Sequence, residues 1–395
     1  MSKKNGLVLT AGGARGAYQA GVLKRLGELP ALHSKPCPFQ IITGASAGAL
    51  NGSFLATGTD DFSGTTKRIA SLWSNLNVEN VFKTDPFSLS AGTGRWMKDL
   101  ALGGIFGGGS AQSLLDFTPL RNYIKNEIQV DKIQAGIQKG HLYAVAISAT
   151  NYFSGKSYTF IQGQPNHPLW TKSRRIALST ELTVEHIWAS CAIPIIFQPV
   201  LVETPDGAFY FGDGGLRLVA PFSPAIRLGA SKIFAIGIRC QKTAEQRSTH
   251  ELIDSAGKKP KMRKPPLAQI FGVALNSIFL DHLDSDLDHL RRMNELMISL
   301  HQTSAELKGS EPMRVVQPFA LNPSVDLATV ADTFSHKMPK MIRYLMEGLG
   351  SSKAQSADLL SYLLFDSSYT QALIDIGYQD AGKVANELES FLLDP

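Results

Sequence analysis

A serine lies at the centre of a short glycine-rich motif near the N-terminus. The sequence GASAG at residues 44–48 fits G-x-S-x-G and follows the apolar run Phe39–Thr43. A serine on a tight strand-to-helix turn projects its oxygen from the sheet edge, and the flanking glycines let neighbouring backbone pass without a Cβ clash. The helix that follows directs N–H groups towards developing negative charge. We therefore interpret Ser46 as a candidate nucleophile, supported by Gly44 and Gly48.

A second glycine-rich block, GGARG at residues 12–16, also lies between an apolar strand and a helix. Consecutive glycines leave backbone N–H groups bare and convergent, as an oxyanion hole requires. The block matches neither G-x-x-x-x-G-K-[ST] nor G-x-G-x-x-G, so it predicts neither a P-loop nor a dinucleotide site. Arg15 could anchor this loop or attract an anionic headgroup, and an exposed arginine with a structural role is the alternative.

A nucleophilic serine needs a base, and the aspartate in FYFGDGG at residues 209–215 is the best candidate. Asp213 ends an apolar strand, and Gly214 and Gly215 permit a sharp turn and close backbone approach. Its reference pKa of about 3.9 would make it a poor base, but burial would raise that pKa. A plain Asp-Gly-Gly turn is the structural alternative. Of the nine histidines, His250 is the best candidate for a triad.

These blocks together resemble one family. The order and spacing of residues 12–16, 44–48 and 213–215 resemble the patatin-like phospholipases, and ASCAIPIIFQP at residues 189–199 is similar to that family's A-S-x-A-x-P-x-x-F-x-P stretch. The resemblance covers residues 5–240. It implies a three-layer α/β/α fold with a mainly parallel sheet. It also implies a Ser–Asp dyad that hydrolyses acyl esters of lipids, such as phospholipids, without a metal or cofactor.

The resemblance also assigns roles residue by residue. Ser46 would be the nucleophile and Asp213 the base, and the backbone at Gly12, Gly13 and Ala14 would form the oxyanion hole. The supporting residues would be Arg15, Gly16, Gly44, Gly48, Gly214 and Gly215. One departure is that this chain has Ala11 where the family often has a third successive glycine.

The surrounding elements predict how these residues are positioned. The apolar runs Leu7–Leu9 and Phe39–Thr43 each lead into a glycine turn and a helix, which is a parallel α/β pattern. Further strands are expected at residues 141–149, 156–161, 208–211 and 232–240. We predict a catalytic domain at 1–240, a polar basic linker at 241–266 and a helical extension at 267–395 packed on the core. The extension should begin with one long amphipathic helix from Leu267 to Leu290 and continue with helices near 338–349, 355–365 and 383–393.

Composition excludes several classes of protein. The chain has 395 residues, of which 44% are hydrophobic and 18% charged, so it is not mainly disordered. The formal charge of +5 is mildly basic and does not imply nucleic acid. The cysteines, Cys37, Cys191 and Cys240, lie far apart, which predicts neither a disulfide framework nor a zinc site. A reducing compartment is therefore expected.

No apolar run is long enough to predict a signal peptide or a membrane-spanning helix. We expect a cytoplasmic protein that could make peripheral contact with an anionic membrane. The basic cluster at 258–264 is either a solvated linker or a contact for lipid headgroups. The glycine-rich loop at 103–109 is either a surface connection or a lipid-facing lid. The sequence does not indicate an oligomeric state.

Two patterns resemble other sites. Asp284, Asp286, Asp288 and Glu295 have EF-hand spacing, but His289 stands where the sharp turn needs glycine, so we interpret a solvated helix face. Cys191 is interpreted as a small buried hydrophobe. Two other functions stay open beside the lipid hydrolase: a membrane- or partner-binding regulatory module with vestigial hydrolysis, and an α/β-hydrolase with His250 as base.

Overall fold

The computed structural model describes residues 3–83, 115–240, 267–279, 282–302, 313–338, 343 and 357–394. The predicted linker at 241–266, with its basic cluster and His250, lies outside the described residues. So do the glycine-rich loop at 103–109 and most of the predicted helix at 338–349.

Ten strands in the described part form one sheet in the order β10-β9-β1-β2-β3-β4-β6-β5, and β8 pairs with both β3 and β7. Strands β10, β9, β1, β2 and β3 run parallel, whereas β4 is antiparallel to β3. The mixed α/β fold with a mostly parallel sheet is thereby confirmed. The strands are β1 (Asn5–Leu9), β2 (Ile41–Ala45), β3 (Ala144–Asn151), β4 (Ser157–Gly163), β5 (Thr171–Lys172), β6 (Arg175–Ser179), β7 (Val200–Thr204), β8 (Gly207–Gly212), β9 (Lys232–Ile236) and β10 (Gln317–Leu321).

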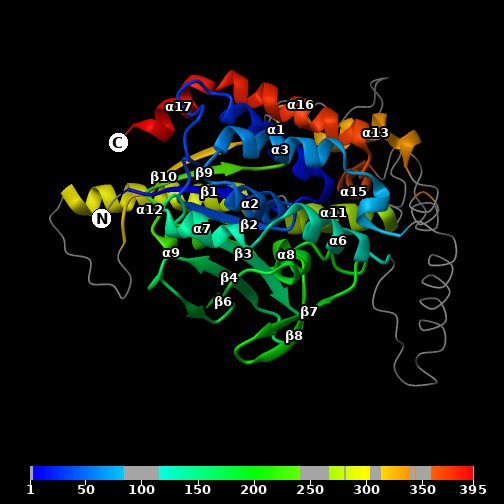
Figure 1. Ribbon diagram of the computed structural model, residues 1–395, viewed down its shortest axis with the longest axis horizontal. Coiled ribbons are helices and arrows are strands. Elements are labelled where there is room, and N and C mark those ends of the chain that lie inside the picture. The colour runs from blue at the N-terminus through cyan, green and yellow to red at the C-terminus, as the bar shows by residue number, and fades with distance from the viewer. Residues whose placement is uncertain are drawn as a thin grey trace, which may run out of the picture.

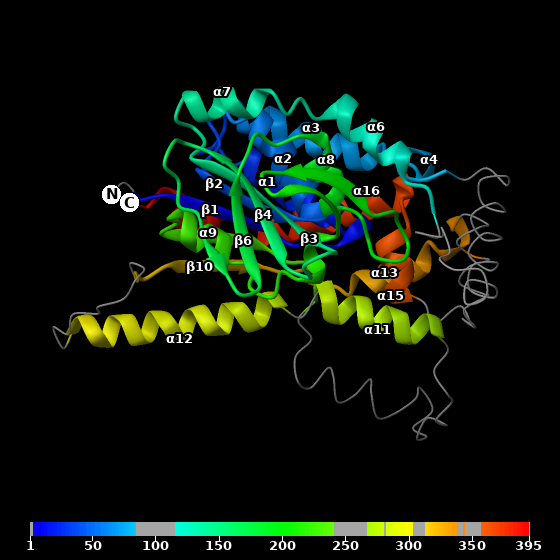
Figure 2. The same ribbon diagram turned by 90° about the horizontal axis from the view of Figure 1, so that it is seen from below.

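Helices cover both faces of this sheet (Figures 1 and 2). On one face, α1 packs against α3 and α16, and on the other face α9 and α12 cover the strands. The helices are α1 (Gly16–Gly27), α2 (Ala47–Thr57), α3 (Phe62–Ser74), α4 (Val78–Val81), α6 (Thr118–Glu127), α7 (Lys132–Gln138), α8 (Val184–Ser190), α9 (Ser223–Leu228), α11 (Leu267–Phe279), α12 (His282–Gln302), α13 (Leu327–Thr333), α15 (Ala357–Leu363), α16 (Ser367–Lys383) and α17 (Ala385–Leu393). Short 3₁₀ turns are η1 (Gly13–Arg15), η2 (Gly214–Leu216) and η3 (Ser335–Lys337).

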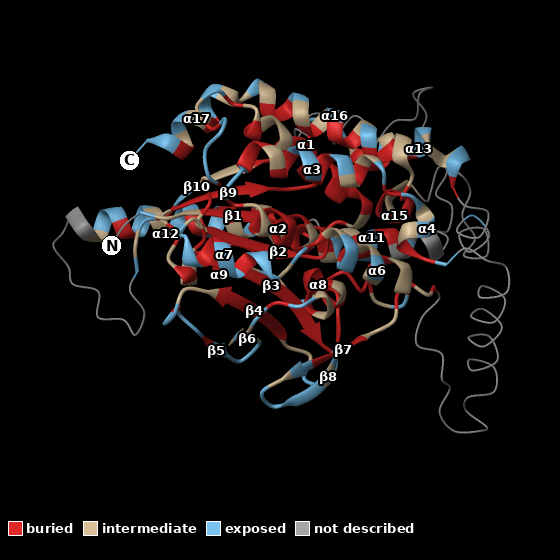
Figure 3. Cartoon of the chain, in the orientation of Figure 1, coloured by how far each residue is buried: buried red, intermediate tan, exposed pale blue. Residues whose placement is uncertain are grey.

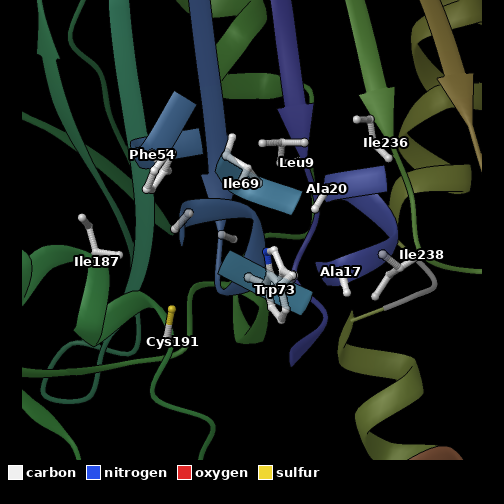
Figure 4. Packing of buried hydrophobic residues seen from close by; sticks show 14 of the residues in the cluster. Leu9, Ala17, Ala20, Phe54, Ile69, Trp73, Ile187, Cys191, Ile236 and Ile238 are labelled. Atoms are coloured by element: carbon white, nitrogen blue, oxygen red, sulfur yellow. The ribbon is translucent and has the colours of Figure 1, made fainter. Parts of the chain in front are cut away.

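The central strands are buried on both faces, as Figure 3 shows. Such strands consist of near-continuous apolar residues, which is why β2, β3 and β9 are recognisable in the sequence. At the carboxyl ends of β1 and β9, Leu9 and Ile236 pack near Ala17, Ala20 and Trp73 of the covering helices (Figure 4).

The strand register brings the three motifs to one sheet edge. Leu9 at the end of β1 pairs with Gly44 of β2 on one side and with Ile236 of β9 on the other. On the far side of β2, the end of β3 pairs with the end of β8, where Thr150 lies opposite Gly212. The loop after β1, the turn after β2 and the turn after β8 therefore converge.

The C-terminal residues contain more than helices. β10 extends the parallel sheet beside β9, and α16 lies along α1. The predicted long helix from Leu267 to Leu290 is described as two helices, α11 and α12. No helix in the described ranges is long and apolar enough to cross a membrane. The proposed division at residues 240 and 266 stays a prediction.

Candidate active site

Ser46 occupies a strained turn between β2 and α2. Its backbone has φ 54° and ψ −124°, a conformation that residues other than glycine rarely adopt. A Cβ on Gly44 would lie 2.3 Å from the Gly48 carbonyl oxygen, and a Cβ on Gly48 would lie 2.1 Å from the Leu9 carbonyl oxygen. Only glycine fits these positions, so the G-x-S-x-G spacing is a requirement of the turn.

A buried serine, Ser190, hydrogen-bonds to the backbone of this turn. The Ser46 amide donates a hydrogen bond to the Ser190 hydroxyl (2.9 Å), which itself donates to the Ser148 carbonyl oxygen (2.6 Å). The next residue, Cys191, contacts the Ser46 carbonyl oxygen at 3.4 Å, and burial raises the pKa of its thiol. Sequence reasoning noted the 189–199 stretch but assigned Ser190 no role.

Asp213 is completely buried and firmly held. Its amide donates to the Ala192 carbonyl oxygen, the Thr150 hydroxyl donates to its carbonyl oxygen, and the Gly215 amide donates to Oδ1, each at 2.8 Å. A Cβ on Gly214 would lie 2.0 Å from the Ser148 carbonyl oxygen, which requires glycine there. The carboxyl orientation is therefore fixed by backbone contacts.

Burial raises the pKa of Asp213 to about 7, and hydrogen bonding by the Ser46 hydroxyl and the Gly215 amide opposes this rise. The Ser46 hydroxyl thus lies close enough to the Asp213 carboxyl to affect its pKa. Oδ2 nevertheless has no hydrogen-bond partner of good geometry among the described residues. No described histidine forms a hydrogen bond with either side chain. The pair therefore combines a serine hydroxyl with a carboxylate that keeps one acceptor atom available near neutral pH.

The glycine loop after β1 contacts both of the other motifs. A Cβ on Gly16 would lie 2.6 Å from the Ala47 Cβ, directly after Ser46. A Cβ on Gly215 would lie 2.7 Å from the Ala11 Cβ. Because these glycines bring three loops into contact, all the site residues predicted from the sequence lie together.

Backbone amides in this loop are available for an anion. Gly13 has φ 54°, and the amides of Gly12, Gly13 and Ala14 donate no hydrogen bond to another described residue. Gly12 and Ala14 are buried, and buried amides are otherwise almost always paired. Such unused donors beside a serine are what an oxyanion hole needs.

Arg15 is buried and anchors this loop to α15. Its Nε donates to the Ser361 hydroxyl (2.8 Å), its guanidinium forms an ion pair with Asp358 (3.4 Å), and it stacks over the Tyr362 ring (4.3 Å). A Cβ on Gly13 would lie 2.4 Å from the Tyr362 carbonyl oxygen. Sequence reasoning missed all three partners, which lie 343–347 positions away.

The site is enclosed in this structure. The exposed fraction is 2% for Ser46 and 0% for Asp213. Phe279 at the end of α11 covers the aspartate turn, since a Cβ on Gly215 would lie 2.6 Å from its ring. The described residues include no group of three His, Cys, Asp or Glu side chains that could hold a metal ion.

Comparison with solved structures gives remote similarities. VipD from Legionella pneumophila is 12% identical, with 98% of this chain and 67% of that chain covered and a TM-score of 0.36. ExoU from the type III secretion system of Pseudomonas aeruginosa, in complex with SpcU, is 12% identical, with 92% and 77% covered and a TM-score of 0.27. No curated protein matches the chain significantly.

The family comparison is more informative. The model of the patatin-like phospholipases matches residues 7–226, which is more than half of the chain and includes all three motifs of the site. The resemblance noted in the sequence is confirmed, and the chain belongs to the patatin-like phospholipase family of lipid acyl hydrolases.

Proposed function

We propose that this protein is a serine acyl hydrolase of phospholipase A or lysophospholipase type, which cleaves carboxylic esters of lipids through a Ser46–Asp213 dyad. The observation that carries the proposal is the pairing of a serine on a strained turn with a buried carboxyl whose pKa is raised to about 7. A base is most useful when its pKa lies near the working pH.

In the first half of the reaction, Ser46 Oγ attacks the ester carbonyl carbon while its proton passes to Asp213. The amides of Gly12, Gly13 and Ala14 hold the oxyanion of the tetrahedral intermediate. Collapse of this intermediate breaks the bond to the alcohol, which takes the proton from Asp213 as it leaves. The serine is then acylated.

In the second half, water attacks the acyl-serine carbonyl, and Asp213 takes a proton from this water. A second tetrahedral intermediate forms at the same amides. Its collapse releases the fatty acid and returns the proton to Ser46 Oγ. Protein groups supply the base and the charge stabilisation, so we expect activity to persist after treatment with a chelator.

The test is Ser46→Ala in the full chain, assayed with a p-nitrophenyl ester and with phospholipid. We expect a loss of at least about 10³-fold, because removal of a nucleophile abolishes the covalent route. Ser53→Ala is a matched control, since Ser53 is a buried serine of α2 that follows the turn. Hydrolysis at the wild-type rate by folded Ser46→Ala protein would reject the proposal.

Covalent labelling separates hydrolysis from a purely regulatory role. A fluorophosphonate reacts with an activated serine, and we expect it to label Ser46 stoichiometrically. Folded wild-type protein that stays unlabelled would instead favour a binding module with vestigial hydrolysis.

A further inference from the structure

A cavity away from the three motifs is lined by residues of α9, α12, the start of β6 and the segment before β10. Figure 2 shows how α9, α12, β6 and β10 are arranged. The volume of the cavity is about 340 Å³, which lies within the range of sites that bind small molecules. None of its lining residues belongs to the three motifs around Ser46 and Asp213.

Hydrogen bonds hold the walls of this cavity together. Asn294 of α12 donates to the Val316 carbonyl oxygen (2.7 Å) and accepts from the Val316 amide (3.0 Å). The Phe222 amide at the start of α9 donates to Asp286 of α12 (2.8 Å). Arg314 donates to the Ile226 and Ala230 carbonyl oxygens at the end of α9. The cavity is therefore formed before any ligand enters it.

The polar part of the lining is cationic. Arg175, Arg227 and Arg314 supply three guanidinium groups, against one carboxylate at Asp286. That carboxylate accepts the Phe222 amide and also interacts electrostatically with Arg175 and with the lining residue His289. Arg175 Nη1 is buried and has no hydrogen-bond partner among the described residues. Since unsatisfied guanidinium donors pair best with carboxylate or phosphate oxygens, an anion is the ligand that this wall fits.

Much of the remaining wall is apolar and adaptable, beside the polar lining residues Ser223, His289 and Asn294. Its side chains are those of Ile226, Leu290, Met293, Met297, Met313 and Val316. Unbranched methionines adjust to ligands of different shape and are common at such surfaces. The cavity thus offers positive charge and the unpaired Arg175 Nη1 donor to a charged head, and a methionine-rich surface to a hydrocarbon chain.

We propose that this cavity binds a single-chain lipid anion with a carboxylate or phosphate head. A fatty acid, which the proposed hydrolysis releases, has this chemistry, and so does a lysophospholipid whose head carries a net negative charge. Only that link to the reaction rests on the proposed function, because the binding itself needs neither Ser46 nor Asp213.

The experiment is calorimetric titration of the full-length Ser46→Ala protein below the critical micelle concentration of each probe. The probes are decanoate, decyl phosphate, inorganic phosphate and the neutral decyl maltoside. We expect both lipid anions to bind at least about tenfold more tightly than inorganic phosphate or decyl maltoside, because head and chain both contribute. The tighter of the two anions identifies the head as carboxylate or phosphate.

Two arginine variants locate the binding. Arg175→Gln should weaken binding of the preferred anion at least about tenfold, since it removes a charge-assisted pair. Arg174→Gln is the matched control, because Arg174 is the exposed neighbour outside the cavity lining and should leave the affinity within about twofold. Arg227→Gln is a second cavity variant, for use if Arg175→Gln does not fold.

Equal affinities in the control and both cavity variants would overturn the proposal. Binding of decyl maltoside as tight as that of the anions would overturn it too. Because catalysis is not measured, these results are independent of whether Ser46 is the nucleophile. Conversely, loss of ester hydrolysis in Ser46→Ala with no anion binding would support the proposed function and reject the cavity.

Discussion

Residues 7–226 and helix α15 contribute to the same site in different ways. The first region supplies the serine, the aspartate and the amides, and a family model recognises it. Helix α15 lies outside that match, yet it contacts the amide-bearing loop through Ser361, Asp358 and Tyr362. The proposed reacting groups therefore come from the first region, while contacts with α15 help to position the loop that carries the amides.

The largest effect is expected where the two regions touch. Gly13→Ala would place a Cβ 2.4 Å from the Tyr362 carbonyl oxygen at a residue with φ 54°. The loop or α15 must then shift, and we expect kcat to fall about 10²–10³-fold, as when one oxyanion donor is lost. Initial rates on a p-nitrophenyl ester measure this.

Gly140→Ala is the matched control for strain alone. Gly140 also has a positive φ, 75°, but an added Cβ there meets no other atom within 4 Å. We expect a small loss of stability and near-wild-type kcat. Equal losses of activity in the two variants would show that the contact with α15 has no special importance.

The next prediction concerns the pH dependence of hydrolysis, which depends on Asp213 in residues 7–226. Because the pKa of Asp213 is raised to about 7, its carboxylate is present above that pH and lost below it. We expect kcat/KM to rise with pH and level off above about 7, with roughly a hundredfold loss at pH 5. A pH–rate profile that stays flat from 5 to 8 would contradict the role of Asp213 as base.

The raised pKa of Asp213 also predicts that stability falls as the pH rises, whereas activity rises. The pKa of Asp213 is higher in the folded state, about 7, than its ordinary value of 3.8. Asp213 therefore lowers the free energy of unfolding least below pH 3.8, and this destabilisation grows as the pH rises through about 7. Asp213→Asn should therefore abolish hydrolysis but raise Tm at pH 8 by a few °C, on the order of 2–4 °C per kcal/mol. A lower Tm at pH 8 would argue against the raised pKa.

The features of the fold and the site that can be predicted from the sequence are those with a local cause. Ser46, Asp213 and the glycine loop are visible because tight turns demand glycine at fixed offsets after apolar strands. Ser190 accepts a hydrogen bond from Ser46, 144 positions away, and Ser361 accepts one from Arg15, 346 positions away. No local sequence pattern predicts such contacts. β10 is similarly hidden, since five residues within a helix-rich region give little periodicity.

A smaller effect tests the contribution of α15 directly. Ser361→Ala removes the hydroxyl that accepts from Arg15 Nε, while the ion pair with Asp358 and the stacking on Tyr362 stay. We expect kcat to fall about tenfold with little change in KM, because a charged hydrogen bond contributes roughly 1.5–3 kcal/mol. Ser390→Ala on α17 is the control, because Ser390 is exposed and its hydroxyl donates to Asp394. A purely structural role would lower Tm without changing kcat.

The smallest effect concerns access to the site. Phe279 lies against Gly215, and its ring is tilted against that of Tyr362 with the ring centroids 5.5 Å apart. It therefore connects α11 to residues 7–226 and to α15, and Ser46 is only 2% exposed. Phe279→Ala should expose Ser46 more often and speed its fluorophosphonate labelling about two- to threefold, because loss of this contact makes local opening of the site easier. Val273→Ala on the same helix is the control, because Val273 is 59% exposed. Unchanged labelling in Phe279→Ala would mean that substrate enters by another path, and the contact would then serve only to pack α11 on the sheet.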